Sequence, residues 1–177
     1  MLSQNKKIAF YAEASMGLTN AKMAEGIIRY GSNPAVAVVD STAAGKTLSD
    51  VCKIDSDVPI VSSIQEAIAL GAEVLVLGTA PSGGRFPKEW SNVVSLALSA
   101  GLSVVNGLHD RLNDIYGQNL RKDQWIWDVR TPVGGLPPIA NARAATLKNK
   151  RVLMVGTDMA IGKMTAGLEL YKTLKEH

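Results

Sequence analysis

The sequence predicts an α/β protein: a Rossmann-like parallel sheet with helices on both faces, followed by the first strand, loop and helix of a P-loop domain. Short runs rich in Val, Ile and Ala alternate with longer amphipathic stretches, and polar or glycine-bearing turns separate them. A glycine-rich loop at residues 156–162 stands between an apolar run and a helical pattern. Strands that alternate with helices are typical of parallel sheets covered on both faces.

The apolar runs place the strands in chain order. We expect strands at residues 8–11, 35–40, 60–62, 74–77 and 102–105, with an added strand at 125–129. Helices are predicted at residues 19–30, 64–70 and 88–100, with a weaker helical turn at 111–116. Thr19 or Asn20 is the expected N-cap of the first helix and Ser63 that of the second, because their side chains can accept from free amides.

The chain divides into three parts at its composition changes. Residues 1–130 form the Rossmann-like domain, and residues 131–149 form a proline-rich connector. Residues 150–177 begin a second domain, with a strand at 150–155 and a helix at 163–175. This P-loop pattern stops after one helix, so the domain looks truncated, and we expect these 177 residues alone not to hydrolyse nucleotide.

Composition limits the compartment and the partners. The 19 basic and 16 acidic residues are spread along the chain, and this net charge of +3 is too mild to indicate a nucleic-acid partner. No signal peptide or membrane-spanning run is present, and the single Cys52 excludes an internal disulfide and multi-cysteine metal sites. We therefore expect a cytoplasmic protein, a small-molecule substrate, no metal site, no membrane partner and a homo-oligomer.

The most specific motif is the loop that precedes the last helix. Gly156 is followed by five residues and then by Gly162, Lys163, Met164 and Thr165. Glycines let backbone amides turn inward around a phosphate, the helix N-terminus adds positive potential, and a lysine reaches the outer oxygens. The loop therefore predicts phosphate binding, the alternative being a structural glycine turn.

This loop departs from the common form, which has four residues between the glycines and a hydroxyl directly after the lysine. The longer loop, which begins with Gly156, Thr157 and Asp158, resembles the dethiobiotin synthetase branch of P-loop proteins. Met164 takes the usual hydroxyl position and leaves metal binding in question, although Thr165 could supply the hydroxyl.

A second Gly-Lys-Thr run ends the stretch at residues 40–47. Asp40 stands where the first glycine of a P-loop would be, which weighs against a second phosphate loop. Either Asp40 and Lys46 contact a ligand at the carboxyl end of the sheet, or the stretch is a solvated turn.

Ligands of open parallel sheets bind beyond the carboxyl ends of the strands. Gly83, Gly84 and Arg85 follow one such end and suggest an oxyanion clamp of amides and a guanidinium. His109 and Asp110 follow the next strand, where an imidazole could act as a general base or simply form a hydrogen-bonded loop histidine.

Two further features of this edge are less specific. Asp128 and Arg130 come after the last strand and form either a structural ion pair or part of the site. A dinucleotide site is disfavoured, because the first strand is followed by Gly17 alone where that fingerprint needs three glycines.

Five motifs in this order, VVDSTAAGKT, VLGTAPSGGRFPKEW, VVNGLHDRL, WDVR and VGTDMAIGKMTAGLEL, resemble one bacterial family over nearly the whole chain. This family, formerly known only as a domain of unknown function, combines a Rossmann-like N-terminal domain with a P-loop C-terminal domain. Its members are described as D-glutamate N-acetyltransferases, and Gly-Lys-Met-Thr is the family's own pattern.

The resemblance implies acetyl transfer from acetyl-CoA to the amino group of D-glutamate. A phosphate loop made of Gly156–Asp158 and Gly162–Thr165 could hold the phosphates of acetyl-CoA. Candidates for the chemistry are His109 with Asp110 as base, the Gly83 and Gly84 amides as oxyanion donors, and Arg85 as a carboxylate ligand. Asp40, Lys46 and Arg130 are further substrate-binding candidates. The alternatives are an ATP- and Mg-dependent carboxylate-activating enzyme and a noncatalytic nucleotide-binding protein.

Overall fold

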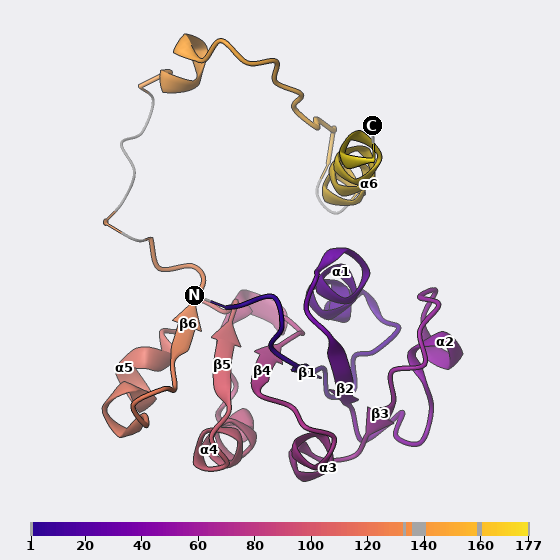
Figure 1. Ribbon diagram of the computed structural model, residues 1–177, viewed down its shortest axis with the longest axis vertical. Coiled ribbons are helices and arrows are strands. Elements are labelled where there is room, and N and C mark those ends of the chain that lie inside the picture. Colours follow the sequence, from indigo (N-terminus) through magenta and orange to yellow (C-terminus); the bar gives the residue numbers. More distant parts are fainter. Residues whose placement is uncertain (1, 133, 136–140, 159–160, 177) are drawn as a thin grey trace. The chain divides into compact units, whose positions relative to one another are not determined.

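The computed structural model describes residues 2–132, 134–135, 141–158 and 161–176, and the chain forms two compact units, residues 1–133 and 134–177. The first unit contains one six-stranded parallel sheet with the order β3-β2-β1-β4-β5-β6 (Figure 1). The strands are β1 (Ile8–Tyr11), β2 (Ala35–Val39), β3 (Ile60–Val61), β4 (Val74–Leu77), β5 (Ser103–Asn106) and β6 (Ile126–Asp128). This is a Rossmann strand order, so the predicted fold class is confirmed.

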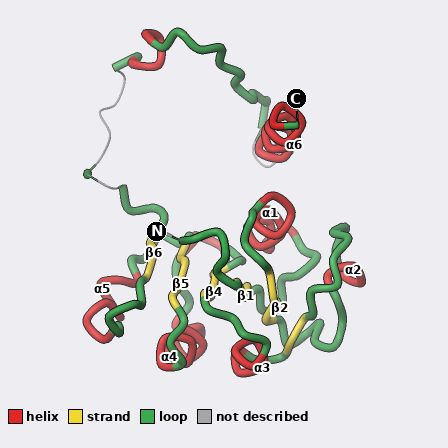
Figure 2. The backbone as a smooth tube through the Cα atoms, viewed as in Figure 1, coloured by secondary structure: helices red, strands yellow, loops and turns green. Residues whose placement is uncertain are grey.

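Helices cover both faces of the sheet, as Figures 1 and 2 show. They are α1 (Lys22–Tyr30), α2 (Leu48–Val51), α3 (Ile64–Ala69), α4 (Ser91–Ser99) and α5 (Leu112–Tyr116). The core residues of α1 and α2 pack on one face, and those of α3, α4 and α5 pack on the other. Short 3₁₀ turns lie at Thr19–Ala21, Ser82–Gly84, Lys88–Trp90, Gly117–Asn119 and Arg143–Thr146.

The first strand shows why the sequence forms this sheet. All four residues of β1 are buried, because β1 lies between two other strands and under helices on both sides. Ile8 and Phe10 face the α1 side, whereas Ala9 and Tyr11 face the α3 and α4 side. An apolar run without polar alternation is what a doubly covered strand requires.

Helix starts agree with the sequence only in part. The Ser63 side chain accepts from the Glu66 amide and caps α3, as predicted. Neither Thr19 nor Asn20 caps the first helix, whose initial turn is a 3₁₀ segment that begins after Leu18. The α1 start is fixed instead by a tertiary contact, since the Ala24 amide donates to the carbonyl oxygen of Gly78 at 2.9 Å.

The second unit contains helix α6 (Lys163–Lys175), which has the predicted bounds. The strand predicted at residues 150–155 is wrong, because these residues have no strand assignment. A strand exists only when its backbone groups pair with a neighbour, and no other strand lies in the described part of this unit. None of the helices described is long and apolar enough to cross a membrane.

Candidate functional site

At the β1–β2 end of the carboxyl edge, the Asp40 carboxylate closes the loop that follows β1. It is 1% exposed and accepts hydrogen bonds from the amides of residues 14–16 at 3.0–3.2 Å. The Thr42 amide and hydroxyl add two more, at 3.0 and 2.6 Å. All of these donors come from the protein, so Asp40 is a structural clamp and is not left to a ligand.

Electrostatics agree with this role of Asp40. Burial alone would raise the pKa of the carboxyl, but the hydrogen bonds from Thr42, Met16 and Ser15 outweigh it and hold the pKa below its ordinary value. The amides of this β1 loop, which a Rossmann protein offers to a dinucleotide, are bonded to Asp40 here.

The second Gly-Lys-Thr run is a turn. The Thr47 side chain and Asp50 form a capping box at the start of α2, a helix too short for the sequence pattern to predict. Lys46 is exposed, and its carbonyl oxygen accepts from the Ile60 amide at 2.8 Å. Its role as a substrate ligand stays a prediction.

Acidic groups dominate this end of the edge. Glu13 accepts from both the amide and the hydroxyl of Ser41. Tyr11, the last residue of β1, packs edge-to-face on Trp90 with ring centroids 5.1 Å apart. Burial, and then the charges of Glu13, Glu89 and Asp40, raise the pKa of the Tyr11 phenol to about 12. An anionic ligand is therefore disfavoured here.

The loops after β4 and β5 are joined through Asp110. Arg85 Nη1 donates to Asp110 Oδ1 at 2.8 Å, and the Phe86 amide donates to Oδ2 at 2.7 Å. The Phe86 amide and then the Arg85 guanidinium hold the pKa of the Asp110 carboxyl below its ordinary value. The Asp110 carboxylate is therefore bonded to the loop that carries Arg85. The predicted role of Arg85 as a ligand of the substrate carboxylate stays a prediction.

His109 lies against the backbone of Gly84. Gly84 has φ +64°, and a Cβ there would lie 2.7 Å from His109 Cδ2 and 3.0 Å from Nε2. The described residues offer the imidazole no hydrogen-bond partner, so His109 and Asp110 do not form a bonded pair. The Gly84 amide donates to the Pro81 carbonyl oxygen at 2.9 Å, which leaves Gly83 as the better oxyanion candidate.

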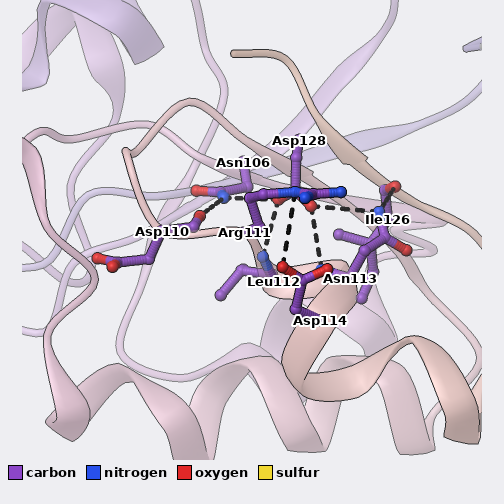
Figure 3. A network of polar contacts seen from close by, with 8 residues as sticks. All are labelled: Asn106, Asp110, Arg111, Leu112, Asn113, Asp114, Ile126 and Asp128. Atoms are coloured by element: carbon purple, nitrogen blue, oxygen red, sulfur yellow. Dashed lines mark hydrogen bonds and ion pairs between the residues drawn. The ribbon is translucent and has the colours of Figure 1, made fainter. Parts of the chain in front are cut away.

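A buried polar network supports the loop after β5. Asn106, 0% exposed, donates through Nδ2 to Asp128 Oδ1 at 2.8 Å and to the Asp110 carbonyl oxygen at 2.7 Å. Asp128 also accepts from the Leu112 and Asn113 amides at 2.9 and 3.0 Å, which caps the start of α5. Figure 3 shows these contacts converging on Asp128, while the Asp110 carboxylate points away from it.

This network corrects one alternative and adds residues that the sequence did not reveal. Asp128 and Arg130 do not pair within the described residues: Asp128 caps α5, and Arg130 Nε donates to the Gly107 carbonyl oxygen at 2.6 Å. Asn106 was expected at the carboxyl edge, after the fifth predicted strand, but no role was predicted for it or for Asn113. Their only sequence signal is an amide residue at each end of the segment 106–113.

A hollow of about 250 Å³ lies at the carboxyl ends of β5 and β6. Its wall contains His109, Arg111 and Arg130. It also contains Asp110 and Asp128, whose carboxylates already accept hydrogen bonds from the protein. The structure therefore brings three of the predicted residues, His109, Asp110 and Arg130, to one place. No group of three His, Cys, Asp or Glu side chains in the described ranges could hold a metal ion.

The phosphate loop of the second unit folds back on its own residues. A Cβ at Gly156 would lie 2.4 Å from Ile161 Cδ1 and 3.2 Å from Lys163 Cδ. Gly162, with φ +95°, precedes α6, and Lys163 Nζ donates to the Asp158 carbonyl oxygen. Loop residues 159–160 lie outside the described residues, so the complete cup of amides stays a prediction.

The described part of the loop fits a phosphate group. The first turn of α6 carries no acidic side chain, and Lys163 lies beside the glycines. Met164, in the hydroxyl position, is 61% exposed, and Thr165 follows it on the exposed surface. Free amides at a helix N-terminus with a neighbouring lysine attract anions.

Comparisons with known proteins agree with this division. Residues 41–132 match the model of a Rossmann-like domain of unknown function, DUF1611_N, and residues 138–177 match its P-loop partner, DUF1611_C. A crystal structure of a DUF1611 family protein from Anabaena variabilis superposes with a TM-score of 0.88 at 41% identity, over 97% of this chain and 50% of that one.

Two curated relatives have the name D-glutamate N-acetyltransferase. The one from a Pseudoalteromonas species is 38% identical over 64% of this chain and 34% of its own length. The one from Tritonibacter scottomollicae is 31% identical over 85% of this chain and 42% of its own length. The chain thus spans less than half the length of these relatives. On its two domain matches, the chain belongs to the DUF1611 family of proteins with a Rossmann-like and a P-loop domain.

Proposed function

We propose that the protein transfers the acetyl group of acetyl-CoA to the amino group of D-glutamate. The observation that carries this proposal is the shared name of two curated relatives, which are 38% and 31% identical to the chain. The chain also matches both domains of the family, the Rossmann-like domain and the P-loop domain. Because the chain spans under half the length of each relative, the activity is proposed for the whole protein.

The chemistry needs a base and a donor for an oxyanion. The amine attacks the thioester carbonyl carbon, the carbon–sulfur bond breaks, and CoA leaves as a thiol after the ammonium has lost a proton. His109 suits the base because its imidazole lines the hollow and is not committed to Asp110. The Gly83 amide suits the developing oxyanion.

The phosphate loop suits the nucleotide part of acetyl-CoA. That molecule carries a diphosphate and a 3′-phosphate, which a helix N-terminus and a lysine bind without phosphoryl transfer. Gly156, Gly162 and Lys163 are the residues proposed to hold it, on the geometry of the described loop. We expect Lys163→Ala to weaken CoA binding about tenfold, whereas the matched Lys172→Ala at the other end of α6 leaves it unchanged.

One alternative keeps the P-loop in its nucleotide-hydrolysing role. The Gly-Thr-Asp start of the loop and the P-loop domain match favour an ATP- and Mg-dependent enzyme that activates a carboxylate. A noncatalytic nucleotide-binding protein is the third possibility.

A single pair of incubations separates the three. The polypeptide is given D-glutamate with acetyl-CoA, and free thiol is measured; it is then given D-glutamate with ATP and Mg, and ADP is measured. Thiol release with N-acetyl-D-glutamate as product supports the proposal. ADP release supports the carboxylate-activating enzyme, and the absence of both products supports the noncatalytic one.

A further inference from the structure

We propose that the hollow at the carboxyl ends of β5 and β6 is a dicarboxylate site, in which Arg111 and Arg130 hold the two carboxylates of the substrate. This inference rests on the proposed function in so far as it takes an acidic amino acid as the molecule to be acetylated. It goes beyond the proposed function because it names the residues that bind the substrate. One of them, Arg111, has no role in the acetyl transfer described above.

The size of the hollow selects a small ligand. Its volume is about 250 Å³, below the range of about 300–1,000 Å³ typical of pockets for drug-sized molecules. A molecule as large as CoA does not fit inside it. An amino acid with a second carboxylate does.

The acids of the hollow already have hydrogen-bond partners within the protein. Asp128 accepts from Asn106 and two α5 amides, and Asp110 accepts from Arg85 and Phe86. The two carboxylates keep their charge and formally balance the two arginines, but their oxygens are used within the protein. The charged groups left to bind a ligand are therefore the arginines.

The two arginines keep donors available. Arg130 uses Nε to bond Gly107, and no described residue accepts from its terminal nitrogens. Arg111 Nε lies 3.6 Å from Asp114 Oδ2, an exposed pair beyond hydrogen-bond distance. A guanidinium with free terminal nitrogens can bind a carboxylate through two parallel hydrogen bonds.

The fold restrains the side chain of Arg130 and the backbone of Arg111. The bond to Gly107 fixes the plane of Arg130, at 2.6 Å from a backbone carbonyl oxygen. Arg111 is the residue directly before α5, and Asp128 fixes that helix start by accepting from its first amides. Asp128 thus fixes the backbone from which the Arg111 side chain extends. The restrained side chain of Arg130 loses less entropy when it binds.

His109 completes the arrangement. Its imidazole lies on the wall of the same hollow and rests on Gly84. A dicarboxylate amino acid held by Arg111 and Arg130 therefore has its amino group within the space that His109 borders. This placement suits a general base for the amine.

The test measures binding by calorimetry with three probes: D-glutamate, glutarate, which lacks the amine, and D-glutamine, which lacks one carboxylate. We expect glutarate to bind and to displace D-glutamate, and D-glutamine to bind at least tenfold more weakly. Arg111→Gln and Arg130→Gln should each weaken glutarate binding tenfold or more, because a charged hydrogen-bond donor is lost. Lys122→Gln, an exposed cation outside the hollow, is the matched control and should leave binding unchanged.

Each outcome decides between the two proposals. Glutarate binding that both arginine variants weaken, without thiol release from acetyl-CoA, keeps the site and removes the acetyl-transfer function. Acetylation with an unchanged KM for D-glutamate in Arg111→Gln and Arg130→Gln keeps the function and overturns the site. Inorganic phosphate that displaces D-glutamate as well as glutarate does would also overturn the dicarboxylate assignment. If Arg130→Gln does not fold, Arg111→Gln decides, because its side chain is exposed.

Discussion

Two buried aspartates at the carboxyl edge of the sheet, Asp40 after β2 and Asp128 at the end of β6, accept backbone amides in the same way but differ in what they leave beside them. At the β1–β2 end, Asp40 gathers the amides of residues 14–16 and closes the loop. At the β5–β6 end, Asp128 gathers the first amides of α5 and leaves two arginines beside an open hollow. The Asp40 carboxylate is bonded to its own loop, whereas the Asp128 carboxylate lies in the wall of a hollow.

The difference shows where a ligand can bind on a Rossmann sheet. The switch point between β1 and β4 is the usual place, but here burial and then the charges of Glu13, Glu89 and Asp40 raise the pKa of Tyr11, the last residue of β1, to about 12. On the site proposed above, we expect an anionic substrate to bind at the arginines near β5 and β6 instead.

Removing the Asp40 clamp should have the largest effect on stability. Asp40→Ala leaves buried amides without an acceptor, and we expect the free energy of unfolding to fall by about 3 kcal/mol. Urea denaturation measures this. Asp40→Asn keeps one acceptor oxygen and should lose less. A loss well under 1 kcal/mol for Asp40→Ala would mean that the β1 loop does not depend on the clamp.

Gly84→Ala should separate backbone strain from the His109 contact. The residue has φ +64°, and a Cβ would meet the imidazole at 2.7 Å, so we expect a loss of about 1–2 kcal/mol and a displaced ring. Gly83→Ala is the control, because its φ of +79° causes similar strain with nothing within 4 Å. The His109 ring resonances in NMR should move only in Gly84→Ala. Equal shifts in both variants would refute the contact.

Much of the fold could be predicted from the sequence, because buried strands and capped helices leave local signals. The apolar run of β4 and the Ser63 cap were placed correctly, and helix α6 had its predicted bounds. The four-residue helix α2 was missed, because a single turn has no periodicity. The strand predicted at 150–155 was wrong, since strand formation depends on a partner that local sequence does not specify.

The site was harder to predict than the fold. Residue type alone placed His109 and Arg130 at the carboxyl edge, and the structure brings both to one hollow. The pairing of side chains was not visible, however. Asp128 was expected either to pair with Arg130 or to serve the site, yet it caps α5. Asn106 bonds to Asp128, which lies 22 residues away in sequence, and local sequence does not reveal such a contact.

Acid should weaken the β1–β2 end through Asp40. The folded-state pKa of this carboxyl is depressed, so its stabilisation is present above the ordinary pKa of about 4 and is lost as the pH falls through the folded value. We expect stability to fall as the pH drops below about 4, and by less in Asp40→Asn. Exposed Asp55→Asn is the matched control and should follow the wild-type curve. Identical slopes for all three proteins would exclude Asp40 as the cause.

The smallest effect is expected for Arg85→Ala, which tests whether a carboxylate ligand binds at the β4 loop or in the β5–β6 hollow. The Arg85 guanidinium pairs with Asp110 at 2.8 Å but is 73% exposed, and the Phe86 amide still holds Asp110 when Arg85 is absent. Exposed ion pairs add little stability, so the urea midpoint of Arg85→Ala should stay within error of the wild type. Glutarate affinity should also stay within twofold, because Arg111 and Arg130 line the hollow and Arg85 does not. A tenfold loss of glutarate binding in Arg85→Ala would place the carboxylate ligand on the β4 loop and favour the Gly83–Arg85 clamp over the β5–β6 hollow.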